Sequence, residues 1–293
     1  MPTAFVSTAM QLEYDTTGSP DDPALLLVMG LTAQMTLWPE RFCKMLAAGG
    51  LFVIRFDNRD CGLSSKLDGV AVDIGAIMAA GREGATTMDV PYDLTHMAAD
   101  AIGLLDHLGI ERAHVAGASM GGMIAQTIAI EHPARCRSLI SIMSTTGEGG
   151  VGEAAPEAMA ALLAPPPTDR QGYIEASDKA AIWQSKKYAD RAAAREQAAA
   201  AYDRSFYPEG ASRQLAATFK SGSRSEKLAA VEVPTLVIHG KDDTLIEPSG
   251  GMRTAELIAN ANLLLVAHMG HDLPEQLWPI LVDAIVSHSR NAD

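Results

Sequence analysis

The sequence predicts an α/β fold, a doubly wound and mostly parallel sheet that carries a helical insertion. Three observations indicate it. Apolar runs of strand length alternate with helix-like segments, a strand–turn–helix pattern surrounds one serine, and one long internal stretch has no strand-like run. Continuously apolar runs suit strands that are covered on both faces, as in a parallel sheet. The clearest runs are residues 24–29, 51–54, 139–143, 235–238 and 262–266.

The segments around these runs complete the pattern. Residues 94–108 carry apolar side chains at helical spacing, Met97 and Leu104 among them. Residues 10–14 alternate between apolar and polar, which predicts an exposed antiparallel strand at the edge of the sheet. The polar tail at residues 289–293 is expected to fray.

The alternation stops between residues 147 and 227, a stretch rich in alanine and charge. Prolines at 165–167 separate two helical parts of it, and residues 189–201 are nearly all strong helix formers. We therefore predict that residues 1–146 and 228–293 form an α/β core. Residues 147–227 would form a helical cap that is inserted after the sixth strand and lies over the sheet.

Length and charge limit the classes of function. A chain of 293 residues can bury a large core, and its net charge of −13 argues against nucleic acid or an anionic membrane as a partner. The longest apolar run is far too short to span a bilayer, and residues 1–11 lack the pattern of a signal peptide. We expect a cytoplasmic protein that binds a small molecule, with assembly into a homo-oligomer left open.

Metal and cofactor signals are missing from the sequence. The cysteines Cys43, Cys61 and Cys136 are odd in number and widely spaced, so they suggest neither a zinc site nor a disulfide framework. No H-E-x-x-H motif occurs, and the glycine-rich residues 147–152 do not open a βαβ unit. The expectation is a protein without a metal or cofactor.

The most informative motif is G-x-S-x-G at residues 117–121. Residues 113–116 before it are typical of a short buried strand, and residues 123–129 after it of a helix. A strand that turns sharply into a helix forces the central residue, Ser119, into a strained conformation and lifts its hydroxyl to the helix N-terminus. The partial positive charge there favours a developing oxyanion. Ser119 is therefore the predicted nucleophile.

A nucleophilic serine needs a base, and the base needs a carboxylate to orient it. One later strand-like run is followed by His-Gly-Lys-Asp-Asp, which offers Asp242 and Asp243. The next run is followed by His-Met-Gly-His, which offers His268 and His271. Both segments follow carboxyl ends of strands, the same edge as Ser119, where open α/β sheets place their sites.

Together these segments resemble the α/β-hydrolase fold family, over about residues 25–286. The resemblance places the family's acid at Asp243, in Gly-Lys-Asp-Asp, and its base at His271, in Gly-His. Residues 56–64 are similar to the family's D-x-R-G-x-G-x-S loop, which is structural. Residues 27–30 and Trp-Pro at 38–39 carry a closer likeness to the bacterial ester-cleaving branch that includes aclacinomycin methylesterase.

Alternatives remain for the acid and the base. Asp242 adjoins Asp243, although the spacing favours Asp243. His268 would lie on the strand end and not in the loop beyond it. Glu148 lies near a strand end from which some relatives supply an acid.

The family pattern also assigns the oxyanion hole. Its backbone N–H donors would be those of Leu31 and Met120. Many relatives have His-Gly at the end of the third strand, whereas this chain has Met29-Gly30. The departure leaves open how the loop that carries Leu31 is held in place.

A serine nucleophile, in place of the aspartate that some enzymes of this fold use, predicts acyl transfer through an acyl-enzyme. The expected activity is hydrolysis of a small carboxylic ester by Ser119, His271 and Asp243. The same residues could serve a cofactor-free perhydrolase or haloperoxidase, a lactonase or a C–C bond hydrolase. A receptor of hydrolase fold that binds a small molecule is the non-enzymatic alternative. Trp183 in the insertion is a candidate either for an acyl pocket or for packing.

Overall fold

One sheet of eight strands organises the chain, in the order β1-β2-β4-β3-β5-β6-β7-β8. The computed structural model describes residues 2–82, 88–165 and 167–292. The strands from β4 to β8 along this order pair in parallel, whereas β2 pairs antiparallel with both β4 and β1. The predicted doubly wound, mostly parallel sheet is confirmed. The strands are β1 (Thr3–Phe5), β2 (Gln11–Thr17), β3 (Ala24–Val28), β4 (Phe52–Phe56), β5 (Ala113–Ala118), β6 (Cys136–Ile142), β7 (Thr235–Gly240) and β8 (Asn262–Val266).

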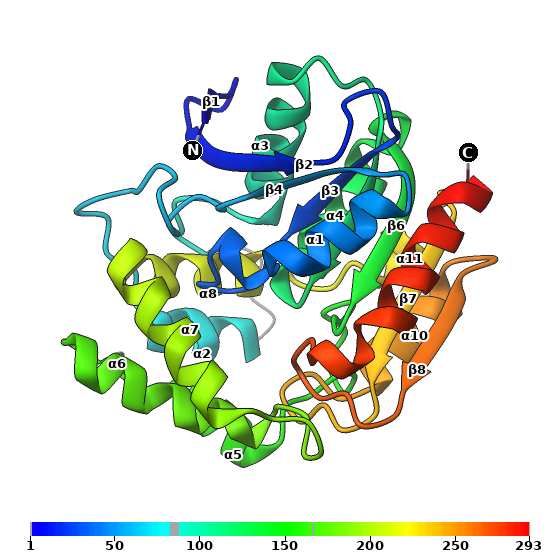
Figure 1. Cartoon of the computed structure of the whole chain (residues 1–293). Helices are drawn as coiled ribbons and strands as arrows, with labels where there is room; N and C mark the ends of the chain where they lie inside the picture. Colours follow the sequence, from blue (N-terminus) through cyan, green and yellow to red (C-terminus); the bar gives the residue numbers. More distant parts are fainter. Residues whose placement is uncertain (1, 83–87, 166, 293) are drawn as a thin grey trace.

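Helices cover both faces of the sheet and bury a separate apolar cluster on each (Figure 1). Helices α3 (Leu94–His107) and α4 (Met120–Glu131) pack on one face, and α1 (Glu40–Ala48) and α11 (Trp278–Ala292) pack on the other. Strand β3, between them, is buried along its whole length, as its apolar sequence predicts. The other elements outside the insertion are α2 (Ile74–Arg82), α10 (Ser249–Leu257), and the short 3₁₀ turns η1 (Met35–Leu37), η2 (Pro133–Arg135) and η4 (Glu275–Leu277).

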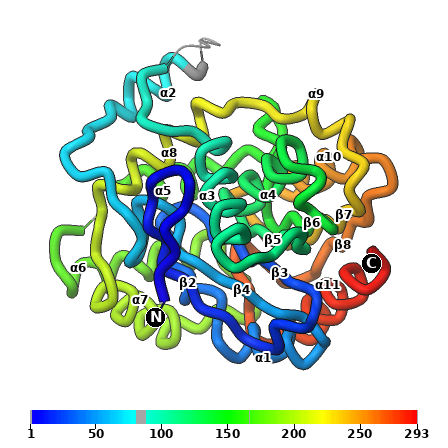
Figure 2. The backbone as a smooth tube through the Cα atoms, turned by 90° about the horizontal axis from the view of Figure 1, so that it is seen from above, coloured from blue at the N-terminus to red at the C-terminus, as the bar shows by residue number. Residues whose placement is uncertain are grey.

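Between β6 and β7 the described part of the chain forms helices and no strand. Figures 1 and 2 show α6, α7 and α8 grouped on the side of the molecule away from α11. The residue limits of a separate cap remain a prediction, and Pro166 lies outside the described residues. The elements of this insertion are α5 (Pro156–Leu162), α6 (Arg170–Ala176), η3 (Ser177–Ile182), α7 (Arg191–Arg204), α8 (Glu209–Ser221) and α9 (Ser225–Leu228).

Three local expectations are wrong at the margins of the sheet. Strand β2 is not the edge of the sheet, because β1 pairs with it. Glu13, on the face of β2 that the alternation predicts to be exposed, is buried beneath the loop after β4. Strand β8 is the opposite edge, so Leu263 is 40% exposed in spite of its apolar run. The tail does not fray at residue 289, since α11 continues to Ala292 and Arg290 donates to the carbonyl of Gly49. Among the described residues, no helix is long and apolar enough to cross a bilayer.

A buried ion pair joins the insertion to the core. The Arg213 guanidinium of α8 donates through two nitrogens to the carboxylate of Asp60, at 2.8 Å each, and both side chains are almost fully buried. Tyr92 donates a further hydrogen bond to Asp60, at 2.7 Å. A Cβ atom on Gly210 would lie 2.0 Å from the Asp60 carbonyl oxygen, so only glycine lets α8 approach this closely. Helix α8 is therefore fixed against the loop after β4.

We predict that Arg213→Met lowers the free energy of unfolding by about 3–5 kcal/mol, because it leaves the buried Asp60 carboxylate without its cation. Arg170→Met is the matched control. Arg170 makes the same two-nitrogen contact with Asp203, but on the surface, where the pair is screened by water. Urea denaturation of both variants measures the difference. Equal effects of the two substitutions would contradict the anchoring role of Arg213.

Candidate active site

The turn between β5 and α4 holds Ser119 in a strained conformation. Its φ of 58° and ψ of −123° lie outside the regions that residues with a Cβ atom favour. Two glycines permit the turn: a Cβ atom on Gly117 would lie 2.0 Å from the carbonyl oxygen of Gly121, and one on Gly121 would lie 2.1 Å from that of Val28. The G-x-S-x-G pattern thus reflects the lack of space between β5, α4 and β3.

The structure brings Ser119, His271 and Asp243 together in a continuous hydrogen-bonded chain. His271 Nε2 lies 2.9 Å from Ser119 Oγ, and His271 Nδ1 lies 2.8 Å from Asp243 Oδ2. Ser119 lies between β5 and α4, Asp243 follows β7, and His271 lies in the loop after β8. The ends of β5, β7 and β8 therefore supply the three groups, with β6 lying between β5 and β7. In this geometry the imidazole can take the serine proton while the carboxylate orients the ring.

The environment of Asp243 favours its ionised form. The second carboxylate oxygen accepts the backbone N–H groups of Leu245 and Ile246, each at 2.9 Å. The buried ring of His239 lies behind the carboxylate, with Nε2 at 3.5 Å. Burial alone raises the pKa of Asp243, but the charge of His271 and the hydrogen bonds from His239, His271 and the Ile246 amide outweigh burial and lower the pKa to about 2.

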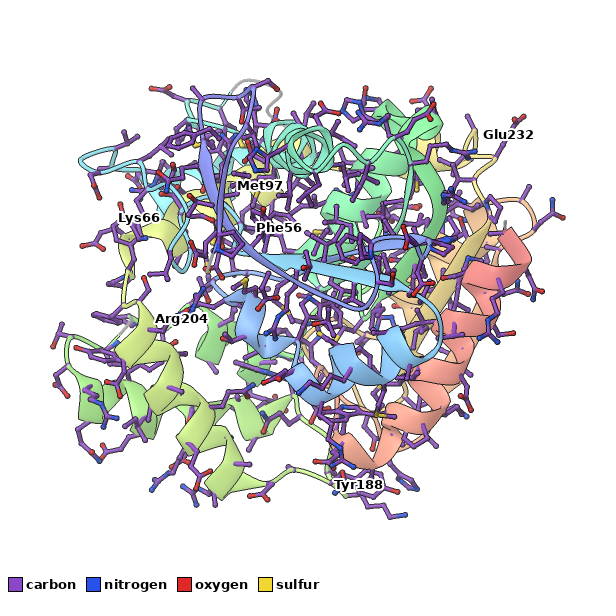
Figure 3. All side chains as sticks on the ribbon, turned by 45° about the horizontal axis from the view of Figure 1, so that its top comes forward. Phe56, Lys66, Met97, Tyr188, Arg204 and Glu232 are labelled. Atoms are coloured by element: carbon purple, nitrogen blue, oxygen red, sulfur yellow. The ribbon has the colours of Figure 1, made fainter. Side chains whose placement is uncertain are left out.

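The structure places the alternative residues elsewhere. His268 is exposed, and its ring packs edge-on against that of Tyr188, which Figure 3 labels. Glu148 pairs with Arg253 at 2.8 Å and accepts the Ser225 hydroxyl at 2.8 Å. The Asp242 side chain is half-buried, and its backbone N–H donates to the carbonyl of Met269. None of these carboxylates or rings has a described hydrogen bond to Ser119 or His271.

The two predicted oxyanion donors flank the serine. Met120 is the first residue of α4, so its N–H has no partner within the helix. Leu31 follows Gly30, and Gly30 faces the serine: a Cβ atom there would lie 3.0 Å from that of Ser119. The loop that carries Leu31 therefore passes directly beside the Ser119 hydroxyl.

A segment of the insertion, for which no sequence motif predicts this role, joins the loops that carry Asp243 and His271. The carbonyl of Ile182 accepts the hydroxyl of Thr244, next to Asp243, at 2.9 Å. The carbonyl of Trp183 accepts the backbone N–H of His271 at 2.6 Å.

The same segment also binds the residues on either side of His271. The N–H of Ser185 donates to the Asp272 carboxylate at 3.0 Å, and the Ser185 hydroxyl donates to the His268 carbonyl at 2.6 Å. These contacts join groups that are far apart in the chain, and no local sequence signal predicts them. Within the described residues, no cluster of three or more His, Cys, Asp or Glu side chains could hold a metal ion.

Comparison with known proteins identifies the family. The sequence profile of the alpha/beta hydrolase fold matches residues 23–276. The chain belongs to the α/β-hydrolase fold family. As a member of it the protein is a hydrolase, and the family predicted from the sequence is confirmed.

This α/β hydrolase is similar to several characterised relatives. A rhodomycin D methylesterase of Streptomyces peucetius is 28% identical over 100% of this chain and 99% of its own length. A 3-oxoadipate enol-lactonase of Acinetobacter baylyi is 27% identical over 94% of this chain and 92% of its own. A solved meta-cleavage product hydrolase of Pseudomonas fluorescens superposes with a TM-score of 0.75, at 19% identity, over 100% of this chain and 98% of the other. The expected likeness to bacterial methylesterases is confirmed.

We predict that Asp243→Asn lowers kcat by about 10⁴-fold, because an amide facing His271 Nδ1 favours the wrong tautomer of the ring. Asp242→Asn is the matched control, since it makes the same chemical change at the adjacent residue without contacting His271. The measurement is kcat on an activated ester, with thermal melts of both variants. A crippled Asp242→Asn beside a nearly unchanged Asp243→Asn would show that the other aspartate is the acid. If both stay active, Glu148 is the next residue to replace.

Proposed function

We propose that this hydrolase cleaves small carboxylic esters through an acyl-enzyme, with Ser119, His271 and Asp243 as its catalytic triad. The observation that carries the proposal is the pair of short contacts at the two nitrogens of His271, to Ser119 Oγ at 2.9 Å and to Asp243 Oδ2 at 2.8 Å. In this order the serine can pass its proton to the imidazole, while the buried carboxylate orients the ring and stabilises the imidazolium, as acyl transfer by a triad requires.

The reaction follows from this geometry. Ser119 Oγ attacks the ester carbonyl carbon while His271 Nε2 takes the hydroxyl proton. The negative charge passes to the carbonyl oxygen, which the N–H groups of Leu31 and Met120 stabilise. His271 then returns its proton to the leaving alcohol as the C–O bond breaks. Water then enters and gives a proton to His271 as its oxygen attacks the acyl carbon. The bond to Ser119 Oγ breaks, and His271 returns this proton to Oγ as the acid leaves, which restores both residues.

The names of the relatives support an ester as the substrate. One is a methylesterase and another an enol-lactonase, and a lactone is a cyclic ester. Both align with nearly the whole of this chain. A small-molecule ester is therefore the proposed partner, in a cytoplasmic setting. The test is a panel of simple esters, lactones and vinylogous diketones, in which faster cleavage of a C–C bond than of any ester would overturn the assignment.

The first expected result concerns the nucleophile. Ser119→Ala should lower kcat by about 10³–10⁶-fold and leave the fold intact, because it removes the hydroxyl that forms the proposed acyl-enzyme. A fluorophosphonate should label Ser119 in the wild-type protein, as read by peptide mass spectrometry. Residual turnover near that of the wild type, or labelling at a different serine, would disprove the mechanism.

The second expected result is a pH profile with a single acid limb. Attack requires neutral His271, so kcat/KM should rise as pH increases and this imidazole loses its proton. Because the pKa of Asp243 is lowered to about 2, the carboxylate stays ionised throughout that limb and its stabilising contribution is lost only as pH falls toward 2. Activity should therefore fall while circular dichroism still reports folded protein. Constant activity through the whole range of histidine titration would point to a different base.

A further inference from the structure

The loop that carries Leu31 lacks the histidine that many relatives place before its glycine, yet it is tightly fixed. Leu31 N–H belongs to the peptide between Gly30 and Leu31, and the carbonyl of that peptide accepts the N–H of Ala33 at 3.2 Å. Thr32, the next residue, has a φ of 57°, which an L-residue adopts only when its surroundings hold it there. The direction of the Leu31 N–H therefore depends on how the neighbouring peptides are held.

Two buried amide side chains hold those neighbours. On the near side, Asn58 Nδ2 donates to the carbonyl of Met29 at 2.8 Å. On the far side, the N–H of Thr32 donates to Gln214 Oε1 at 2.7 Å, although the two residues are 182 positions apart. The peptide that bears the Leu31 N–H thus lies between two peptides that are each held by a side-chain hydrogen bond.

The Gln214 side chain can adopt only one orientation. Its Nε2 donates to the carbonyl of Arg59 at 2.7 Å while its Oε1 accepts from Thr32. A backbone N–H can only donate and a carbonyl can only accept, so turning the amide over would lose both hydrogen bonds. Gln214 is fully buried, and an unpaired amide there would be costly.

The helix that carries Gln214 is itself immobilised. The preceding residue, Arg213, makes the buried two-nitrogen contact with Asp60, and Gly210 one turn earlier packs on the Asp60 backbone. Gln214 accordingly projects from a fixed helix of the insertion into the loop beside Ser119. It supports this loop from a distant part of the sequence.

We propose that Gln214 is a positioning residue for the oxyanion hole, which aims the Leu31 N–H at the developing oxyanion by fixing the peptide after it. This proposal rests on the proposed ester hydrolysis. Because the oxyanion forms only in the transition state, loss of the Gln214 contact should lower kcat and leave KM nearly unchanged. Replacing a residue that only stabilises the fold would change the melting temperature without lowering kcat selectively over KM.

The test compares Gln214→Met with Gln126→Met. Gln126 is also fully buried, and it hydrogen bonds to Ser141 and Arg224, away from the Leu31 loop. We expect Gln214→Met to lower kcat by about 10- to 100-fold, less than the roughly 10²–10³-fold loss from removing an oxyanion donor outright. Affinity for a trifluoromethyl ketone, whose adduct with Ser119 places an oxyanion in the hole, should fall in parallel. Gln126→Met should leave both quantities close to wild type.

Two further substitutions keep the test decisive if Gln214→Met does not fold. Gln214→Asn retains a buried amide but shortens it by one methylene, which withdraws the oxygen from Thr32, so it should also lose kcat and ketone affinity. Gln214→Glu keeps an oxygen for the Thr32 N–H and should retain more of both, even if it melts earlier. Wild-type kcat and ketone affinity in folded Gln214→Asn or Gln214→Met would overturn the proposal.

Ser119→Ala, assayed beside these variants, distinguishes a failure of the role proposed for Gln214 from a failure of the proposed ester hydrolysis. If Ser119→Ala is inactive while the Gln214 variants behave like Gln126→Met, only the role of Gln214 fails. If Ser119→Ala keeps its turnover, the proposed function fails, and the inference about Gln214 fails with it.

Discussion

The strained turn at Ser119 is the constraint on which the rest of this site depends. A φ of 58° at a residue with a Cβ atom persists only because β5 and α4 are both fixed by packing on either side of it. The same crowding leaves room for nothing larger than hydrogen at Gly117 and Gly121. The turn points the hydroxyl away from the sheet and leaves the N–H of Met120 free at the start of α4. The proposed nucleophile and one proposed oxyanion donor are thus products of a single backbone conformation.

The proposed acid and base lie on separate loops, and the insertion joins those loops. The carbonyl of Ile182 accepts the hydroxyl of the residue after Asp243, and the carbonyl of Trp183 accepts the N–H of His271. Ser185 binds a carbonyl before His271 and a carboxylate after it. Each contact is a hydrogen bond that replaces water at a partly buried polar group, where an unpaired donor or acceptor would be costly. Part of the chain between β6 and β7 therefore holds the loops of Asp243 and His271 in fixed positions relative to each other.

Ion pairs join the insertion to the core at the loop after β4. Asp57 accepts the N–H groups of Met35 and Leu63 and pairs with Arg204, which Figure 3 labels at the end of α7, at 2.7 Å. Asp60, three residues later, pairs with Arg213 of α8. Burying a carboxylate is costly unless cations and N–H groups contact it, so the positions of α7 and α8 are tied to this loop. The family resemblance of residues 56–64 thus corresponds to a structural role.

Local sequence determined the elements that depend on neighbouring residues. The apolar run at 24–29 and the glycines around Ser119 predict β3 and the turn into α4, because covered strands and a crowded turn allow few residue types. Tertiary structure decided what depends on distant partners. Leu263 is exposed because no strand pairs beyond β8, and Glu13 is buried because the loop after β4 covers it. Gln214 meets Thr32 only once α8 has packed, since a hydrogen bond between residues 182 positions apart leaves no periodicity or spacing in the sequence.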